Sequence, residues 1–78
     1  MAFTTKLDTQ VVTMATSGGA FVFINSDATI ELNNVVAYHT WVKPDGTVTA
    51  YTTLYVTGAA APLVVTNTYA AIDALINP

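Results

Sequence analysis

The side chains with the most potential for chemistry in this 78-residue chain are one histidine and the aromatic residues around it. His39 is the single histidine, and the chain has no cysteine. A zinc site normally takes three or four His, Cys or carboxylate ligands, so one chain does not supply a metal centre. As a general base, His39 would need a nucleophile with an orienting carboxylate, whereas its expected neighbours are Trp41, Tyr51 and threonines. We therefore expect no enzyme activity, no metal and no cofactor.

Two other patterns with chemical potential lead to the same expectation. Ser17-Gly18-Gly19 is rich in glycine but lacks the following Lys-Ser/Thr of a phosphate-binding loop, so it indicates a turn. Asp27 and Glu31 are four residues apart, but on strands separated by a bend they would not form a carboxylate pair.

The elements that must position these residues are mostly strands. Val, Thr, Tyr, Phe, Ile and Trp fill most of the chain, and these residue types suit a pleated surface. Turn signals recur at short spacing, which is typical of a small barrel or sandwich. We predict strands at residues 6–14, 20–25, 28–32, 35–42, 47–57 and 63–66.

The spacing of apolar residues becomes that of a helix at the C-terminal end, where we predict a short helix over about residues 68–76. Tyr69, Ile72 and Ile76 fall on one helical stripe with Leu75 beside them. Asn67 is the predicted N-cap. The stripe fits either the chain's own sheet or a neighbouring subunit.

The segment Lys43-Pro44-Asp45-Gly46-Thr47 predicts a hairpin with a three-residue loop, in which a type I turn precedes a left-handed glycine. The resulting register assigns four residue pairs to the core face: Val42–Val48, Thr40–Ala50, Tyr38–Thr52 and Val36–Leu54. The opposite face then gathers His39, Trp41, Tyr51 and Tyr55, together with Val35, Ala37, Thr49 and Thr53. Because exposed aromatic surface promotes association, we expect this face to be a subunit interface or a platform on which bases or other planar ligands stack. A register slipped by one residue would instead place this face in the core. A third hypothesis is a small-molecule binder that uses a cleft between Trp41 and Tyr51.

The composition restricts the partners. Charged residues make up 9% and hydrophobic residues 53% of the chain, and the net charge is −3 with only two lysines. Because ordinary domains are about 25% charged, we expect much of the surface to be covered by another copy or by neutral polar groups. The charge gives no long-range attraction for phosphate or an anionic membrane. Any nucleic-acid binding would therefore rest on stacking and neutral hydrogen bonds.

The sequence also indicates where the protein works. The first ten residues lack the basic start and apolar run of a signal peptide. The uncharged stretches 9–26 and 46–72 are interrupted by glycine or proline, so we expect no membrane helix. We expect a soluble cytoplasmic protein.

The stretch from Gly19 to Val35 resembles the first signature motif of the Sm and LSm proteins. The matching positions are Gly19, Phe21, Ile24-Asn25, Ala28-Thr29, Leu32 and Asn34-Val35. Val56-Thr57-Gly58 followed by Leu63-Val64-Val65 is similar to the second motif. The low charge and the Val-rich strand running into a short helix resemble phage proteins, which makes the chain similar to a marine or cyanophage-type Sm-like protein. Such an origin would place it in the host cytoplasm.

This resemblance implies an all-β fold, a small and strongly bent five-stranded Sm-like barrel, formed by residues 1–78 as one domain with the short C-terminal helix. It implies a homo-oligomeric ring that binds single-stranded RNA or DNA near its pore, through Asn25, Asp27, Thr29, Thr57 and Gly58. These positions depart from the family's binding residues: Asn25 replaces an aspartate, Asp27 a stacking residue, Thr29 an asparagine and Thr57 an arginine. We therefore keep a second hypothesis, a structural or scaffolding phage oligomer without nucleic-acid contact.

Overall fold

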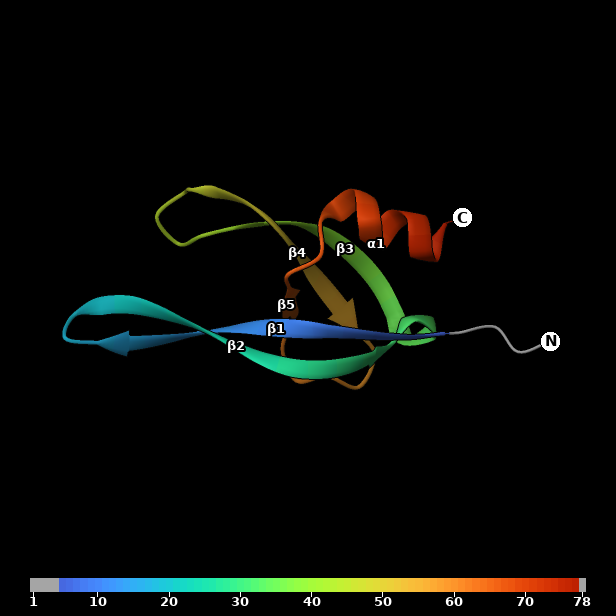
Figure 1. Ribbon diagram of the computed structural model, residues 1–78, viewed down its shortest axis with the longest axis horizontal. Helices are drawn as coiled ribbons and strands as arrows, with labels where there is room; N and C mark the ends of the chain where they lie inside the picture. Colours follow the sequence, from blue (N-terminus) through green and yellow to red (C-terminus); the bar gives the residue numbers. More distant parts are fainter. Residues whose placement is uncertain (1–4, 78) are drawn as a thin grey trace.

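The computed structural model describes residues 5–77 as an antiparallel five-stranded sheet with one short helix (Figure 1). Residues 1–4, which belong to the segment on which the signal-peptide prediction rests, lie outside the described residues. The elements are β1 (Lys6–Ser17), β2 (Ala20–Glu31), the 3-10 turn η1 (Leu32–Asn34), β3 (Val35–Val42), β4 (Val48–Val56), β5 (Leu63–Val65) and α1 (Tyr69–Ile76). The all-β prediction with a C-terminal helix is confirmed.

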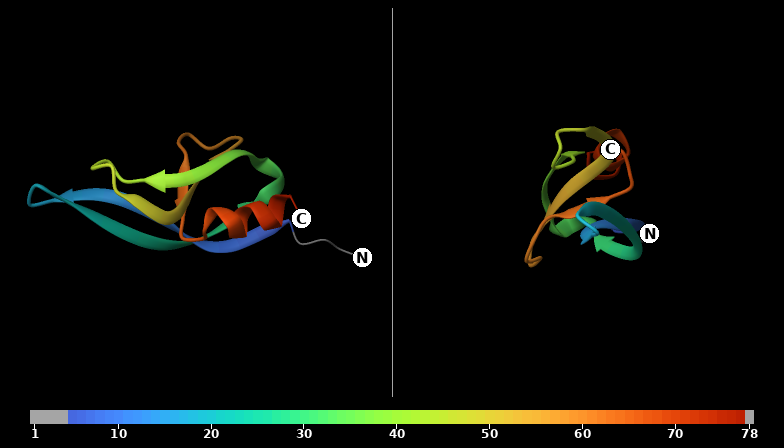
Figure 2. Two further views of the ribbon diagram at one scale, coloured as in Figure 1. Left: turned by 90° about the horizontal axis from the view of Figure 1, so that it is seen from above. Right: turned by 90° about the vertical axis from the view of Figure 1, so that its left-hand side faces the viewer.

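The strand order is β2-β1-β5-β4-β3, so that β2 and β3 form the two edges of the sheet. The last strand returns to the first, with Val11 opposite Val65 and Val12 opposite Val64. This pairing curls the sheet into two layers, one carrying the β1–β2 hairpin and the other the β3–β4 hairpin, and both hairpins point toward the same end of the molecule (Figure 2). Between β2 and β3 the described sheet stays open, and η1 connects these two strands.

The β1–β2 hairpin is longer and more regular than predicted. All twelve residues of β2 pair with β1, from Ser17 opposite Ala20 to Lys6 opposite Glu31. The predicted break at residues 25–27 is therefore wrong. These polar residues continue the ladder, and Asp27 accepts a hydrogen bond from the Gln10 amide at 3.2 Å. The two-residue turn is made by glycines with φ of 60° and 81°, the backbone of a type I′ turn that matches strand twist.

The β3–β4 turn is confirmed, whereas most of the predicted register is wrong. Lys43 N–H donates to the Thr47 carbonyl, Gly46 N–H donates to the Lys43 carbonyl, both at 2.9 Å, and Gly46 has φ of 90°. Val42 does pair with Val48, but Thr40 then pairs with Thr52 and Tyr38 with Leu54, a shift of two residues.

A bulge explains this shift. Between the pairs Thr40–Thr52 and Val42–Val48, one residue of β3 lies opposite three residues of β4. The Thr49 hydroxyl donates to the Trp41 carbonyl at 2.9 Å and accepts from the Tyr51 N–H at 3.1 Å. Thr49 thus supplies the hydrogen bonds that the bulge removes from the ladder.

Part of the predicted core face is also wrong. A second irregularity between Val35 and Ala37 breaks the alternation, so that Val36 is 71% exposed while Val35 packs against the core. Val42 and Val48, at 48% and 70% exposed, flank the hairpin turn and do not belong to the core cluster. Thr53, predicted on the outer face, is buried where β4 is flanked by β3 and β5.

The core lies at the end of the molecule opposite the hairpin tips. Its buried side chains are Ile30, Leu54, Val65 and Ile72. Strands β1 and β3 add partly buried residues, including Val11 and Tyr38, so that every regular element except η1 contributes. The helix stripe therefore packs on the chain's own sheet.

The helix starts as predicted, but its cap is different. Thr68, rather than Asn67, is the N-cap, and its hydroxyl accepts from the Ala71 N–H at 3.2 Å. Asn67 instead binds the segment before the helix to the sheet. Its side chain accepts a hydrogen bond from the Thr9 hydroxyl, and its backbone carbonyl accepts one from the Thr52 hydroxyl at 2.8 Å.

Candidate functional site

Three aromatic rings join the two hairpins, and we call this group, with the adjacent lysine, the aromatic junction. Phe23 of β2 meets Trp41 of β3 edge-on, with ring centroids 5.6 Å apart and an interplanar angle of 79°. Trp41 stacks on Tyr51 of β4 at 6.3 Å and 5°. The Lys43 ammonium lies 5.1 Å from the Phe23 ring centroid, within the range of a cation–π interaction. The junction therefore holds the two layers together beyond the core.

The structure divides the predicted aromatic face into two pairs. Trp41 and Tyr51 belong to the junction, while the rings of His39 and Tyr55 form a separate pair at 5.5 Å. His39 Nδ1 lies 2.8 Å from the Thr40 carbonyl, and Nε2 lies 3.0 Å from the Tyr55 hydroxyl. Because a carbonyl only accepts, Nδ1 donates to Thr40, and in the tautomer with its hydrogen on Nδ1 the ring accepts from the Tyr55 hydroxyl through Nε2.

The hypothesis of a small-molecule cleft between Trp41 and Tyr51 stays a prediction. The two rings are nearly parallel, with centroids 6.3 Å apart. Sequence reasoning also missed Phe23, the third ring of the junction. Alternation along β2 could have placed Phe21 and Phe23 on one face, but the curl that brings this face to β3 depends on distant strands.

The part of the β1–β2 hairpin beyond the core is exposed on both faces, and we call residues 13–24 the arm. Every residue in this range is exposed. Met14 lies opposite Phe23 on one face, and Val22 and Ile24 belong to the other face by alternation. The large apolar side chains of the arm keep much of their surface in water: Met14 47%, Phe21 55%, Val22 41%, Phe23 36% and Ile24 49%. The arm is a two-sided apolar ribbon.

Three of the predicted nucleic-acid contacts lie together on β2, just inside the arm. Asn25, Asp27 and Thr29 are exposed and share one face. The Thr29 hydroxyl donates to the Asp8 carboxylate at 2.8 Å, and Gln10 donates to Asp27. Two carboxylates therefore border this surface, and their charge opposes a phosphate backbone.

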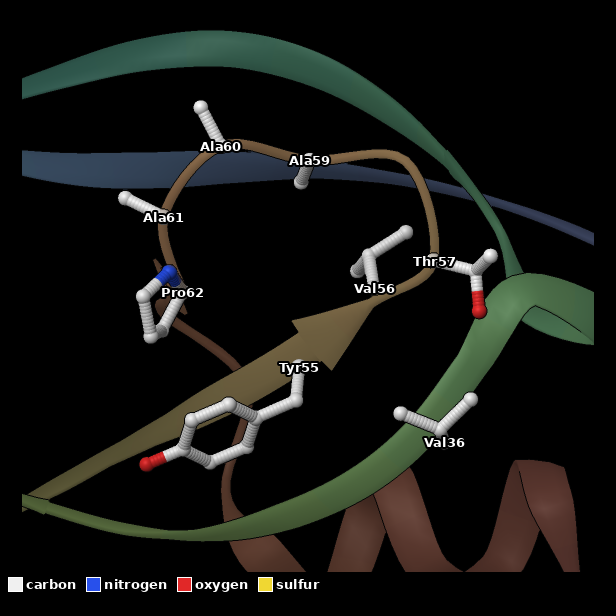
Figure 3. Close-up of a pocket in the computed structure, with 8 residues that line it drawn as sticks. All are labelled: Val36, Tyr55, Val56, Thr57, Ala59, Ala60, Ala61 and Pro62. Atoms are coloured by element: carbon white, nitrogen blue, oxygen red, sulfur yellow. The ribbon is translucent and has the colours of Figure 1, made fainter.

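The other two predicted contacts lie in the loop between β4 and β5. Thr57 is bonded through its N–H to the Asn34 carbonyl at 2.8 Å, and Gly58 has φ of 87°. Beside them is a shallow pocket of about 160 Å³ (Figure 3). Its lining residues are Val36, Tyr55, Val56, Thr57, Ala59, Ala60, Ala61 and Pro62. These described residues include no charged side chain, so they offer neutral contacts only. Among the described residues, no hydrogen bond joins this loop to Asn25, Asp27 or Thr29.

A polar network fastens α1 to β3. The Tyr38 hydroxyl donates to Asp73 at 2.6 Å and accepts from the Asn77 amide at 2.8 Å. The bond to Asp73 and burial raise the pKa of Tyr38 to about 12. The same bond, with a second from Asn77, lowers the pKa of the Asp73 carboxyl. The network stabilises the fold and lies away from the junction.

Within residues 5–77, the structure shows no cluster of three or more His, Asp or Glu side chains that could hold a metal ion. The one helix described there is too short to cross a bilayer. Comparisons with protein-family models, curated proteins and solved structures found no match to this chain.

Proposed function

We propose that this protein is a non-catalytic assembly subunit, a structural or scaffolding component that associates with copies of itself through the β1–β2 arm. The observation that carries the proposal is the uninterrupted exposure of residues 13–24 together with their apolar composition. A protein that works as a monomer rarely leaves a contiguous apolar surface of this kind in water.

The regular pairing of the arm supports this proposal. Its register is regular over the full length of β2, and the aromatic junction braces it against the second hairpin. A rigid, preformed contact element loses little conformational freedom on binding. The absence of charge between residues 9 and 26 means that no ionic side chain of the arm itself must be desolvated when the arm is covered.

The test is the mass of the protein in solution as a function of concentration. Wild-type protein should sediment as a reversible oligomer at micromolar concentration, and Phe21→Ser combined with Val22→Thr should shift it toward the monomer. The matched control is Leu75→Ser, which removes a comparably exposed apolar side chain, 48% exposed, from the helix. A wild-type monomer at every concentration would contradict the proposal.

A second proposed function, the Sm-like nucleic-acid-binding ring, has one favourable observation. Lys43 of the aromatic junction lies at the Phe23 ring, and a cation next to aromatic rings is the usual composition of a single-strand stacking platform. The pairing of β1 with β5 also joins the first and last strands, as a barrel would. Anisotropy titrations with labelled oligo-U and single-stranded DNA test this proposal: Trp41→Ala and Lys43→Gln should weaken the binding, and no binding by the wild-type oligomer would exclude it.

A further inference from the structure

The two edge strands of the sheet differ in how well they are protected from pairing with another chain. Edge β3 carries two register irregularities, between Val35 and Ala37 and between Thr40 and Val42. Edge β2 carries none over twelve residues. Bulges, lysines and prolines are the usual devices that prevent edge-to-edge association, and β2 contains no lysine or proline.

The backbone of β2 offers unpaired groups along its free edge. Ser17 and Ala20 close the two-residue turn, and residues that close such a turn exchange hydrogen bonds with each other. Alternation along the antiparallel pair then turns the N–H and C=O groups of Phe21, Phe23 and Asn25 away from β1. No described strand pairs with this side of β2.

We infer that the free edge of β2 pairs with the same edge of a second copy of this chain, in an antiparallel and two-fold symmetric arrangement. This inference rests on the proposed function and specifies its contact. The uncharged stretch 20–26 is the natural extent of the pairing, because Asp27 follows immediately. An antiparallel pairing of this stretch with itself is centred on Phe23, so that both Asp27 carboxylates stay outside.

The apolar area exposed on the arm is of the order that such a dimer needs. At 36–55% exposure and about 200 Å² for a large side chain, the five apolar residues expose about 450 Å². Two arms expose about 900 Å² before their polar side chains and edge backbone are included, and a specific interface needs about 1,000 Å² in total. A second copy, with an equally neutral arm, fits this surface better than a charged partner.

The symmetric register also accounts for the position of the aromatic junction. With Phe23 at the two-fold axis, the Phe23 rings of the two copies lie side by side on one face of the joined sheet. Each ring already contacts Trp41 of its own chain. The two junctions then form one continuous aromatic row, while Val22 lies opposite Ile24 of the second copy on the other face.

The experiment compares two matched lysine substitutions by sedimentation velocity. Ile24→Lys places a charge on β2 at a side chain that is 49% exposed, and Val36→Lys does so on β3 at one that is 71% exposed. Both should retain the wild-type circular dichroism spectrum. We expect I24K to weaken self-association by at least about tenfold, because burying a charge in an apolar contact is unfavourable, and V36K to leave it unchanged.

A cross-linking experiment checks the register of the proposed pairing independently of the sedimentation measurements. The chain has no cysteine, so Phe23→Cys introduces a single thiol. Paired residues at the axis have Cα atoms about 5.5 Å apart, which suits a disulfide. With oxidised glutathione, F23C should form covalent dimers rapidly and Val36→Cys should not.

The outcomes separate this inference from the proposed function. If V36K dissociates the oligomer, or I24K leaves its mass unchanged and F23C does not cross-link, the contact is elsewhere, and the assembly proposal stands without β2 pairing. A wild-type protein that is monomeric at all concentrations overturns both.

Discussion

The β1–β2 hairpin has two halves that differ in burial although both are strand-forming and apolar. In the half near the core, Ile30 is 4% exposed and Val12 is 8% exposed. In the arm, Phe21 is 55% exposed and Ile24 is 49% exposed. The two halves differ in burial because different elements pack against them. Side chains of β4, β5 and α1 pack against the half near the core. Among the described residues, the arm is contacted by the aromatic junction alone. Strand pattern alone therefore does not determine which apolar residues a chain buries by itself.

The largest expected effect is a difference in the free energy of unfolding between a substitution in the core and one in the arm. Leu54→Ala removes a completely buried side chain and should lower the free energy of unfolding by about 2–5 kcal/mol. Ile24→Ala in the arm should change it by less than about 0.5 kcal/mol at concentrations where the protein is monomeric. Urea denaturation of dilute protein measures both values, and similar losses at the two sites would show that the arm belongs to the core.

Substitutions at two neighbouring threonines near the core should change the free energy of unfolding by smaller amounts and in opposite directions. The Thr52 hydroxyl donates to the Asn67 carbonyl, so Thr52→Val should destabilise the fold by about 1–2 kcal/mol. The buried Thr53 hydroxyl has no partner among residues 5–77, so Thr53→Val should stabilise it by up to about 1 kcal/mol. Thermal unfolding of the two variants should shift in opposite directions, and a loss with T53V would contradict the assigned hydrogen bonds.

The contact of the helix with β3 should make stability depend on pH at both extremes. The folded state lowers the pKa of Asp73, so its contribution is complete above the unfolded value near 4 and is lost as the pH falls through the lower folded value. The folded state raises the pKa of Tyr38 to about 12, so its contribution is complete below about 10 and is lost between 10 and 12. Tyr38→Phe should flatten both limbs of a plot of melting temperature against pH.

The smallest effect is expected from salt on the arm. Because residues 9–26 carry no charge, association through the arm should change little as sodium chloride is raised, and ammonium sulfate should strengthen it. Light scattering at fixed protein concentration measures this. Dissociation by sodium chloride would indicate an ionic contact outside the arm.

The sequence allowed prediction of the strand-rich fold, the C-terminal helix and the Pro44-Asp45-Gly46 turn, because local propensity and turn chemistry determine them. The register beyond that turn was not predictable, because the bulge depends on hydrogen bonds of the Thr49 side chain. Residues 25–27 have the composition of a turn, yet the long ladder of β1 keeps them extended. The aromatic junction was predicted only in part, since Phe23 comes from a strand distant in sequence.

The central claim is that the core half of the hairpin is covered within one chain and the arm by a second copy. Amide hydrogen exchange, measured residue by residue at two protein concentrations about a hundredfold apart, tests it most directly. We predict that protection at Ile30 and Leu54 is independent of concentration, whereas protection at Phe21, Phe23 and Asn25 rises with concentration. Exchange in the arm that is equally fast at both concentrations would contradict the claim.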